Sequence, residues 1–427
     1  MLLDSENKMI DILNECNYCL NCKLKPCSNK GCPLNNDIPT FIKYVKDENY
    51  EQAYKILSNT TVLSGVCGKI CPHTKQCQGS CVRGIKGKPV QIGELEALVF
   101  EKTVKDEKAL YNCYKDEIKE TNKKVAIIGG GPAGLTCAAF LARNGVKVTI
   151  YEKYNYLGGL LIHGIPEFRL PKDIVELTVS NILKLGIKVE YNKELGKNIF
   201  LNVLENNYDA IFLSYGANNS SKMKIPGEEL DGVYGGNELL EYKLHPDYKG
   251  KKVVVIGGGN VAMDVSRTIK RLGAKEVTIV YRRDRKQMPA EEKEIEDAIS
   301  EGINFLLKSN VVKINGLKKV ESIEIIKTEL IKKEGESREV PVNIENSNNV
   351  LDTDFVVMAV GSEVSKITYD LGLDLNEWGN VIINDKCQTS NPKIFAGGDL
   401  AGIKATVAFA SKSGKEAANN IIQFLCS

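Results

Sequence analysis

Two apolar runs along the chain each end at a group of three glycines. The first is Lys124-Val-Ala-Ile-Ile before Gly129-Gly-Gly131, and the second is Lys252-Val-Val-Val-Ile before Gly257-Gly-Gly259. A continuous apolar run that stops at glycine is typical of a buried parallel strand that leads into a helix. The two runs begin about 130 residues apart and therefore predict a duplicated α/β architecture.

The remaining pattern divides the chain further. Residues 1–120 mix short helical patterns with Cys, Gly and Pro, and they end in a polar, linker-like stretch at 115–124. Residues 311–349 alternate β-rich pieces with charged turns, which predicts an exposed meander. A third apolar strand at 355–361 and a small-residue helix at 405–422 have no glycine loop of their own, so we expect this tail to complete the first α/β domain.

Length and composition limit the function classes. At 427 residues the chain is longer than one ordinary core, because domains commonly contain about 100 to 200 residues. The net charge of +2 provides no extended basic field for nucleic acid. The acidic, interrupted N-terminus does not resemble a signal peptide, and no run of about 18 apolar residues is free of charge. We expect a cytoplasmic protein without a membrane span.

Thirteen cysteines are present, and nine of them fall between Cys16 and Cys81. Their odd count and the expected compartment favour metal or redox chemistry over a disulfide framework. The spacing is Cys16-x2-Cys19-x2-Cys22-x4-Cys27-x4-Cys32-Pro33, then Cys67-x3-Cys71-Pro72-x4-Cys77-x3-Cys81. Zinc sites typically use two separated CxxC pairs, whereas crowded cysteines with Cys-Pro dipeptides suit iron–sulfur clusters. We therefore expect iron–sulfur clusters, with structural zinc as the alternative.

The cysteine spacing leaves the ligand assignment open. Two cubane clusters need eight ligands, so at least one of the nine thiols is spare. Local spacing assigns the first four cysteines after Cys16 to one cluster and the last four to another. In some ferredoxins, however, a cysteine before proline ligates the other cluster, which makes Cys32 a candidate for crossing between the two runs.

The first glycine group has the fingerprint of a dinucleotide site. Gly129-x-Gly131-x-x-Gly134 stands between a strand and a helix, where glycines permit the tight turn and the close approach of a pyrophosphate. The next strand ends at Glu152, at the expected distance of about 20 residues for a carboxylate that accepts from ribose hydroxyls.

The second group, Gly257-x-Gly259-x-x-Ala262, is the alanine-ended variant of this fingerprint. Its second strand ends at Arg282 and Arg283, with Lys286 close behind, where an NAD site usually carries an acid. Guanidinium groups there can bind a 2′-phosphate, so we expect NADP rather than NAD, although Asp284 interrupts the basic run. A solvated basic turn is the alternative.

Two dinucleotide sites in one chain indicate hydride transfer between two stacked rings, which depends on positioning more than on acid–base groups. Beyond Cys81 the remaining cysteines are isolated, so a thiol pair is not expected to receive flavin electrons. We expect those electrons to leave through iron–sulfur clusters, one at a time, or to a diffusible acceptor.

With these residues considered, the whole chain resembles the glutamate synthase small (beta) subunit family. Relatives of that family include the larger subunit of NADH-dependent reduced ferredoxin:NADP oxidoreductase and the N-terminal half of dihydropyrimidine dehydrogenase. The most specific stretches are Cys67-Gly-Lys-Ile-Cys-Pro-His-Thr-Lys-Gln-Cys-Gln-Gly-Ser-Cys81, Gly164-Ile-Pro-Glu-Phe-Arg-Leu-Pro-Lys172, Gly257-Gly-Gly-Asn-Val-Ala-Met-Asp264 and Ala396-Gly-Gly-Asp399.

The resemblance implies an α/β fold with two Rossmann-like dinucleotide-binding domains, like that of flavin disulfide reductases, preceded by a helical iron–sulfur domain. The expected domains are a two-[4Fe-4S] domain at 1–120, an FAD domain at 121–225 and 355–427, and an NADPH domain at 226–354.

The resemblance also implies the site residues. Two [4Fe-4S] clusters with crossed ligation are expected, one held by Cys19, Cys22, Cys27 and Glu96 and the other by Cys32, Cys71, Cys77 and Cys81. With the fingerprint residues included, the expected FAD site contains Gly129, Gly131, Pro132, Ala133, Gly134, Glu152, Leu160, Arg169, Gly398, Asp399 and Thr406. The expected NADPH site contains Gly257, Gly259, Asn260, Val261, Ala262, Arg282, Arg283, Lys286 and Gly361.

Three functions remain open at this point. The resemblance implies the electron-input subunit of a glutamate synthase-type enzyme, with a larger catalytic subunit as partner. The alternative is a ferredoxin:NADP oxidoreductase subunit, including the electron-bifurcating kind, that works with ferredoxin or a second flavoprotein subunit. A flavoprotein docking module with structural zinc is a third interpretation.

Overall fold

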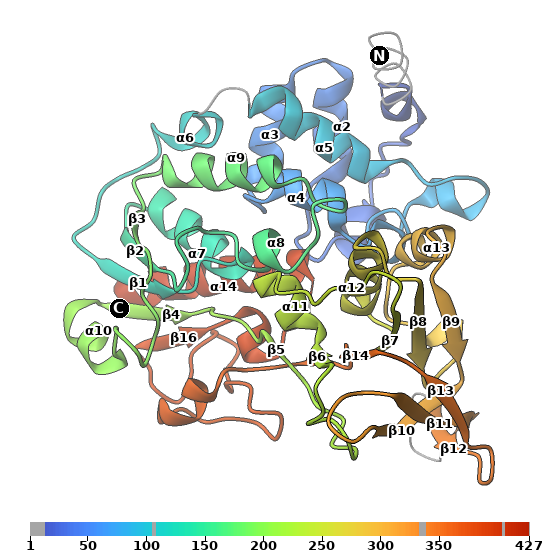
Figure 1. Ribbon diagram of the computed structural model, residues 1–427. Helices are drawn as coiled ribbons and strands as arrows, with labels where there is room; N and C mark the ends of the chain where they lie inside the picture. The colour runs from blue at the N-terminus through green and yellow to red at the C-terminus, as the bar shows by residue number, and fades with distance from the viewer. Residues whose placement is uncertain (1–12, 105–107, 333–338, 404–405, 427) are drawn as a thin grey trace. The chain divides into compact units, whose positions relative to one another are not determined.

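The computed structural model describes residues 13–104, 108–332, 339–403 and 406–426. The chain folds into two compact units (Figure 1). The first comprises Met1–Ile162, Glu167–Ala217 and Lys366–Ser427, and the second comprises His163–Pro166 and Asn218–Ser365.

The first unit contains a parallel sheet of order β16-β4-β1-β2-β3. Its strands are β1 (Lys124–Ile128), β2 (Lys147–Tyr151), β3 (Lys188–Glu190), β4 (Ala210–Leu213) and β16 (Ile394–Ala396). In the central register Ile127 stands between Ile150 and Phe212, and all three side chains are fully buried. The apolar run that follows Lys124 is therefore the centre of a parallel sheet, as predicted.

Two helices lie side by side on this sheet (Figure 1), namely α7 (Pro132–Arg143) and α14 (Val407–Cys426). Gly414 permits their close approach, because a Cβ at this position would lie 2.2 Å from the Ala133 carbonyl oxygen. The hydroxyls of Thr136 and Ser411 are 3.0 Å apart between the same helices. The other helices of this part are α8 (Leu160–His163), α9 (Lys172–Leu183) and α10 (Leu201–Asn207).

The cysteine-rich segment is helical and belongs to the same unit. Its elements are η1 (Cys27–Gly31), α2 (Ile38–Lys46), α3 (Tyr50–Ser58), α4 (Ser64–Ile70), η2 (His73–Lys75), η3 (Val82–Ile85), α5 (Ile92–Thr103) and α6 (Ala109–Tyr114). Thr61 contacts Ser411 of α14 at 3.3 Å, and Arg143 of α7 donates to the Ser58 carbonyl at 2.7 Å. These buried and half-buried bonds tie the cysteine-rich segment to the first α/β sheet.

The second unit contains a parallel sheet of order β6-β14-β7-β8-β9. Its strands are β6 (Val233–Gly235), β7 (Lys252–Ile256), β8 (Glu276–Tyr281), β9 (Asn304–Leu307) and β14 (Phe355–Met358), and its helices are α11 (Gly236–Tyr242), α12 (Asn260–Arg271) and α13 (Glu292–Ser300). Buried Arg267 joins α12 to α13 through ion pairs with Glu294 at 2.6 Å and Glu301 at 2.9 Å.

One strand lies in a different sheet from the one that the sequence suggested. We expected residues 355–361 to complete the first α/β domain, but β14 pairs with β6 and β7 in the second sheet. A strand that is apolar on both faces can join either parallel sheet, and its sequence does not identify its neighbours. Only the later part of the tail, with β16 and α14, returns to the first unit.

The second unit also carries an antiparallel meander, close to the stretch that the sequence predicted. It contains β10 (Ser309–Asn315), β11 (Ser322–Ile331), β12 (Val340–Asn343) and β13 (Asn349–Asp352). A short antiparallel pair, β5 (Asn219–Ser220) with β15 (Ser362–Glu363), stands where the chain enters and leaves the unit. In the described part of the chain, no helix combines the length and apolar character needed to cross a membrane.

Candidate cofactor sites

The first glycine loop has the shape that a pyrophosphate requires. Gly129 has φ of +98°, and a Cβ there would lie 2.7 Å from the Tyr215 Cα atom. A Cβ at Gly134 would lie 2.0 Å from the Gly129 carbonyl oxygen, so only glycine fits at this helix–strand contact. At Gly131, in contrast, a Cβ would meet nothing within 4 Å. The middle glycine therefore leaves open space beside the N-terminus of α7, where an anion is favoured.

Glu152 holds this loop from the end of β2. Its side chain is buried, Oε2 accepts from the Gly130 amide at 2.8 Å, and Oε1 accepts from the Tyr154 amide at 3.0 Å. Burial raises the pKa of this carboxyl, while the two amide hydrogen bonds oppose the increase. Each carboxylate oxygen has a further lone pair, so Glu152 can order the loop and still accept from a ribose hydroxyl.

Other predicted FAD residues gather at the same loop. A Cβ at Gly159 would lie 3.0 Å from the Gly131 Cα atom, which places Leu160, at the start of α8, beside the loop. A Cβ at Gly398 would lie 3.2 Å from the Ala133 Cβ, so Gly398 and Asp399 also stand at this edge. Burial raises the pKa of Asp399 to about 6.

The two remaining predicted FAD residues lie just before helices. Thr406 precedes α14, and its hydroxyl oxygen accepts from the Phe409 amide at 3.4 Å. Arg169 is half-buried in the segment between α8 and α9.

The second glycine loop repeats the geometry of the first. Gly257 has φ of +143°, and a Cβ there would lie 2.1 Å from the Ala359 carbonyl oxygen. A Cβ at Gly259 would have no neighbour closer than Pro289 Cγ at 4.0 Å, while Ala262 is fully buried. Gly361 follows Ala359 after β14, so it lies near the same end of the sheet.

A loop after β8 folds back onto this second glycine group. The Ala290 amide donates to the Gly258 carbonyl at 3.1 Å, and Asn260 Oδ1 accepts from the Glu291 amide at 3.2 Å. Val261 lies beside the start of α11, since its Cγ1 would lie 3.3 Å from a Cβ at Gly236. The basic turn between β8 and this loop is therefore held close to the glycines.

Within the basic turn, the Asp284 carboxylate that interrupts the basic run is held in an ion pair. Asp284 pairs with Lys308 at 3.0 Å and accepts from the Arg285 amide at 2.7 Å, and the Lys308 hydrogen bond lowers the pKa of Asp284. Arg285 itself binds Glu292.

The three predicted cations of this turn have no ion-pair partner among the described residues. Arg282 and Lys286 are exposed, and none of Arg282, Arg283 and Lys286 forms an ion pair with a described residue. Arg283 is half-buried, and its Nε is buried without a hydrogen-bond partner in the described part of the chain. These residues fit the 2′-phosphate of NADP.

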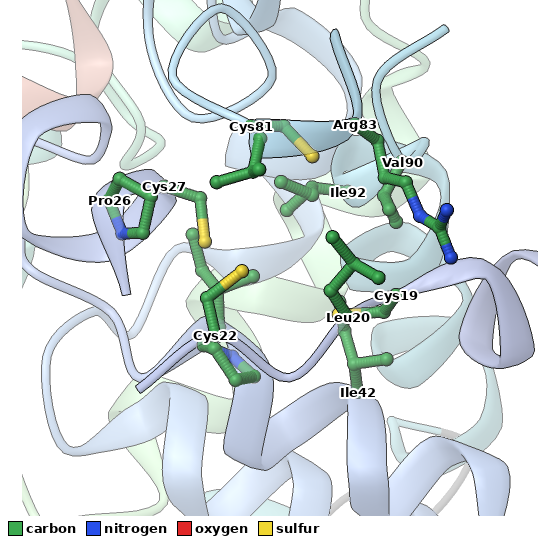
Figure 2. Close-up of a pocket in the computed structure, with 13 residues that line it drawn as sticks. Cys19, Leu20, Cys22, Pro26, Cys27, Ile42, Cys81, Arg83, Val90 and Ile92 are labelled. Carbon is green, nitrogen blue, oxygen red and sulfur yellow. The ribbon is translucent and has the colours of Figure 1, made fainter. Parts of the chain in front are cut away.

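In the cysteine-rich segment, four thiols line one pocket. They belong to Cys19, Cys22, Cys27 and Cys81, and the rest of the lining is mostly apolar. Figure 2 shows the sulfurs of Cys22 and Cys27 directed into the same space. Nowhere in the described chain do three or more His, Cys, Asp and Glu side chains converge as ligands of a single ion.

Two of the predicted ligands stand beside other thiols than the resemblance implied. We expected Glu96 beside Cys19, Cys22 and Cys27, but Cys81 occupies that place. Arg83 donates to the Tyr18 carbonyl at 2.7 Å, and this bond ties the segment after Cys81 to the first cysteine loop. A contact over 65 residues of sequence could not be inferred from cysteine spacing.

Glu96 lies instead among the second group of thiols. It is on α5, which packs closely on α4 because a Cβ at Gly68 would lie 2.7 Å from the Ala97 amide. Burial raises the pKa of Cys32 to about 12, and the Glu96 charge contributes to this increase. Glu96 also contributes to the raised pKa values of Cys77, where burial is the largest cause, and Cys71, where the Cys67 hydrogen bond is largest.

The surroundings of Glu96 fit a metal ligand. The side chain is 5% exposed, Oε1 has no hydrogen-bond partner in the described part of the chain, and burial raises its pKa to about 8. A buried carboxylate oxygen without a donor is costly, and metal coordination would remove that cost. Cys67, however, is also buried and adjoins Cys71, so the fourth position beside Cys32, Cys71 and Cys77 has two candidates.

Comparison with known families gives two matches that cover different parts of the chain. Residues 123–417 match the pyridine nucleotide-disulphide oxidoreductase family, and residues 3–108 match dihydropyrimidine dehydrogenase domain II, 4Fe-4S cluster. The small chain of NADPH glutamate synthase from Escherichia coli K12 is 35% identical over 433 residues, which cover 95% of this chain and 90% of that one. The chain belongs to the glutamate synthase small-chain family.

Members and relatives of this glutamate synthase small-chain family occur in other enzymes too. The beta subunit of NADP(+)-dependent formate dehydrogenase from Moorella thermoacetica is 35% identical over 94% of this chain and 60% of its own length. Mycobacterium tuberculosis FprA in complex with NADPH has a TM-score of 0.65 and 20% identity, over 72% of this chain and 85% of that one. Thioredoxin reductase from T. acidophilum has a TM-score of 0.55 and 21% identity, over 72% of this chain and 100% of that one. These structures show the fold.

The family resolves several expectations. The predicted fold class is confirmed, as is the prediction of an oxidoreductase with FAD, NADPH and 4Fe-4S clusters. The match to a 4Fe-4S domain favours iron–sulfur over structural zinc. The individual site residues and domain boundaries stay predictions. The unit boundaries at 217/218 and 365/366 lie near the expected 225/226 and 354/355.

Sequence reasoning missed two parts of these sites. Ser214 follows β4, and its hydroxyl donates to the Gly129 carbonyl at 3.0 Å, under the first glycine loop. The loop from Pro289 to Glu291 closes over the second glycine loop. A usable signal existed for Ser214, because the carboxyl ends of parallel strands meet at one sheet edge and a polar residue directly follows an apolar strand.

Proposed function

We propose that the chain is the electron-input subunit of a glutamate synthase-type enzyme and oxidises NADPH. The observation that carries this proposal is the near full-length similarity to the Escherichia coli small chain, at 35% identity over 95% of this chain. The unpaired cations Arg282, Arg283 and Lys286 support NADPH as the donor. Residues 1–120 form the proposed cluster domain and 218–365 the proposed NADPH domain, which includes β14, while the rest forms the FAD domain. We expect the subunit in the cytoplasm.

When bound, the flavin exchanges a hydride with the nicotinamide, and the clusters exchange single electrons. The chain supplies position rather than acid–base groups. Gly131 and Gly259 admit the two pyrophosphates, and Glu152 orders the first loop and receives the ribose. The hydrogen bond between Thr61 and Ser411 fixes the cluster segment to α14, which begins directly after the predicted flavin residue Thr406.

The middle glycine of the FAD loop can be tested directly. Gly131→Ala should leave the fold intact, because a Cβ meets nothing within 4 Å, but should weaken FAD binding about tenfold or more by filling the space for the pyrophosphate. FAD content after purification and the melting temperature of the apoprotein measure the two effects. Gly134→Ala is the contrast, because its Cβ would meet the Gly129 carbonyl oxygen at 2.0 Å and should lower the melting temperature itself. Full FAD retention in Gly131→Ala would contradict the assignment.

We propose two [4Fe-4S] sites, one from Cys19, Cys22, Cys27 and Cys81 and the other from Cys32, Cys71, Cys77 and Glu96. The shared pocket supports the first set. The orphaned, buried carboxylate supports the last ligand of the second.

EPR spectroscopy of reduced protein distinguishes the possible fourth ligands. Glu96→Ala should alter or deplete the signal that Cys32→Ala also removes, and should leave the signal that depends on Cys19 unchanged. Cys81→Ala should alter or deplete the signal that depends on Cys19 and should leave unchanged the signal that Cys32→Ala removes. If Cys67 is the ligand instead, Cys67→Ala will lose iron, whereas Glu96→Ala will keep both spectra and the full iron content, which would reject Glu96.

The glutamate synthase role is tested by co-expression with a large glutamate synthase chain. NADPH-dependent formation of glutamate from glutamine and 2-oxoglutarate is expected from the pair and not from either chain alone. The formate dehydrogenase relative, at the same 35% identity, supports a second candidate in which this chain exchanges electrons between NADP and a different iron–sulfur partner such as ferredoxin. Isolation of the native complex separates the two candidates, because a large amidotransferase chain identifies the first.

A further inference from the structure

The pocket of the first four thiols lies under a strongly apolar surface. Two of its lining residues are themselves exposed, with Leu20 at 49% and Val82 at 37%. Two more large apolar side chains on the same segments are almost fully exposed, with Leu24 at 85% and Ile85 at 77%. Exposed apolar groups concentrated at one functional site, rather than scattered singly, mark an interaction surface.

The two segments that carry these side chains form one face. The Arg83 guanidinium stands over the Tyr18 ring at 4.3 Å, and its Nε donates to the Tyr18 carbonyl at 2.7 Å. The Tyr18 hydroxyl donates to the Lys88 carbonyl at 3.0 Å. Figure 2 shows Leu20 and Arg83 on the same side of the thiol pocket. We call residues 18–30 and 82–88 together the cluster face.

The cluster face is basic as well as apolar. It carries six cationic residues, namely Lys23, Lys25, Lys30, Arg83, Lys86 and Lys88, and it has no acidic residue of its own. Lys25 pairs with the neighbouring Asp37 at 2.7 Å, while the other four lysines form no ion pair with a described residue. Since the whole chain has a net charge of only +2, this excess of positive charge is local.

We propose that the cluster face is the docking surface for an acidic iron–sulfur protein that exchanges electrons with the clusters. This inference rests on the proposed function and adds the partner's chemistry. The apolar centre provides contact area, and the basic rim selects a partner with acidic groups around its own redox centre. One NADPH supplies two electrons and releases one proton, so it reduces two molecules of a one-electron acceptor.

The test measures binding to an acidic [2Fe-2S] ferredoxin, with basic cytochrome c as the opposite probe. Lys23→Glu with Lys86→Glu should weaken ferredoxin binding by the loaded protein about tenfold at low ionic strength and should strengthen cytochrome c binding. The ferredoxin affinity of the wild type should fall with added salt, because exposed charges are screened. Leu24→Ser with Ile85→Ser should weaken ferredoxin binding about tenfold with little dependence on salt.

A matched control lies in the turn between β10 and β11. Leu317→Ser with Lys318→Glu removes one exposed leucine and reverses one exposed lysine, and it should change neither affinity. The rate of flavin reduction by NADPH should be the same in every variant, because none of these residues lies at a nucleotide loop.

The two measurements test the two hypotheses separately: cluster reduction tests the proposed function, and ferredoxin affinity tests the docking surface. Failure of NADPH to reduce the wild-type clusters rejects the proposed function, while the affinities still judge the cluster face. Unchanged ferredoxin affinity in both cluster-face variants overturns the docking inference. Tighter binding of wild type to cytochrome c than to ferredoxin also overturns it. So does a change in the variants' oligomeric mass without a change in ferredoxin affinity, which would assign the face to a second copy of the chain.

Discussion

Cys71→Ala should leave the reduction of flavin by NADPH intact and lower electron transfer to a one-electron protein acceptor by about two orders of magnitude or more. Cys71 belongs to the second group of thiols, beside Cys77 and Glu96. We expect no other route for the electrons, because beyond Cys81 the remaining thiols are isolated in the sequence. Stopped-flow absorbance of the flavin and the rate of ferredoxin reduction measure the two steps in one preparation.

Two further variants separate a broken electron path from a damaged fold. Cys71→Ser keeps an oxygen near the cluster site and should retain part of the iron, while Cys426→Ala removes an exposed thiol at the end of α14 and should behave as wild type. If Cys71→Ala loses cluster iron but reduces ferredoxin at the wild-type rate, the clusters are not on the electron path.

Arg282→Ala combined with Arg283→Ala should weaken NADPH binding about a hundredfold and leave NADH binding nearly unchanged. Each charge-assisted bond to a phosphate is typically worth about 1.5 to 3 kcal/mol, or roughly tenfold or more in affinity. Only the 2′-phosphate would contact these side chains, so a cofactor without it loses little. The rate of flavin reduction at varied NADPH and NADH concentrations gives both affinities.

The neighbouring arginine provides the control for nucleotide choice. Arg285→Ala removes a cation from the same turn, but one that is already bound to Glu292, and it should change the NADPH preference only slightly. If wild type reduces its flavin equally well with both nucleotides, or if the double variant keeps its preference, the basic turn does not select the 2′-phosphate.

The sequence by itself determined the parts of this protein that depend on local chemistry. A buried strand followed by Gly129-x-Gly131-x-x-Gly134 needs positive φ, close packing and open space at fixed positions, and the structure has each of them. The change from Glu152 after the first β-α-β unit to Arg282 and Arg283 after the second was also readable, because charge at the end of a strand is a local property. Family, fold and cofactors followed from such features.

The tertiary structure alone decided which distant segments meet. Phe355–Met358 is apolar on both faces and could have joined either sheet, and only its pairing with β7 places it in the second. Cysteine spacing could not show that the Arg83 contact with Tyr18 brings Cys81 to the first thiol group. Cysteine spacing also could not show that the close contact at Gly68 between α4 and α5 buries Glu96 among the second thiol group. Spacing along the chain limits a ligand's neighbours only within one loop, whereas contacts between loops depend on packing that forms when the whole chain folds.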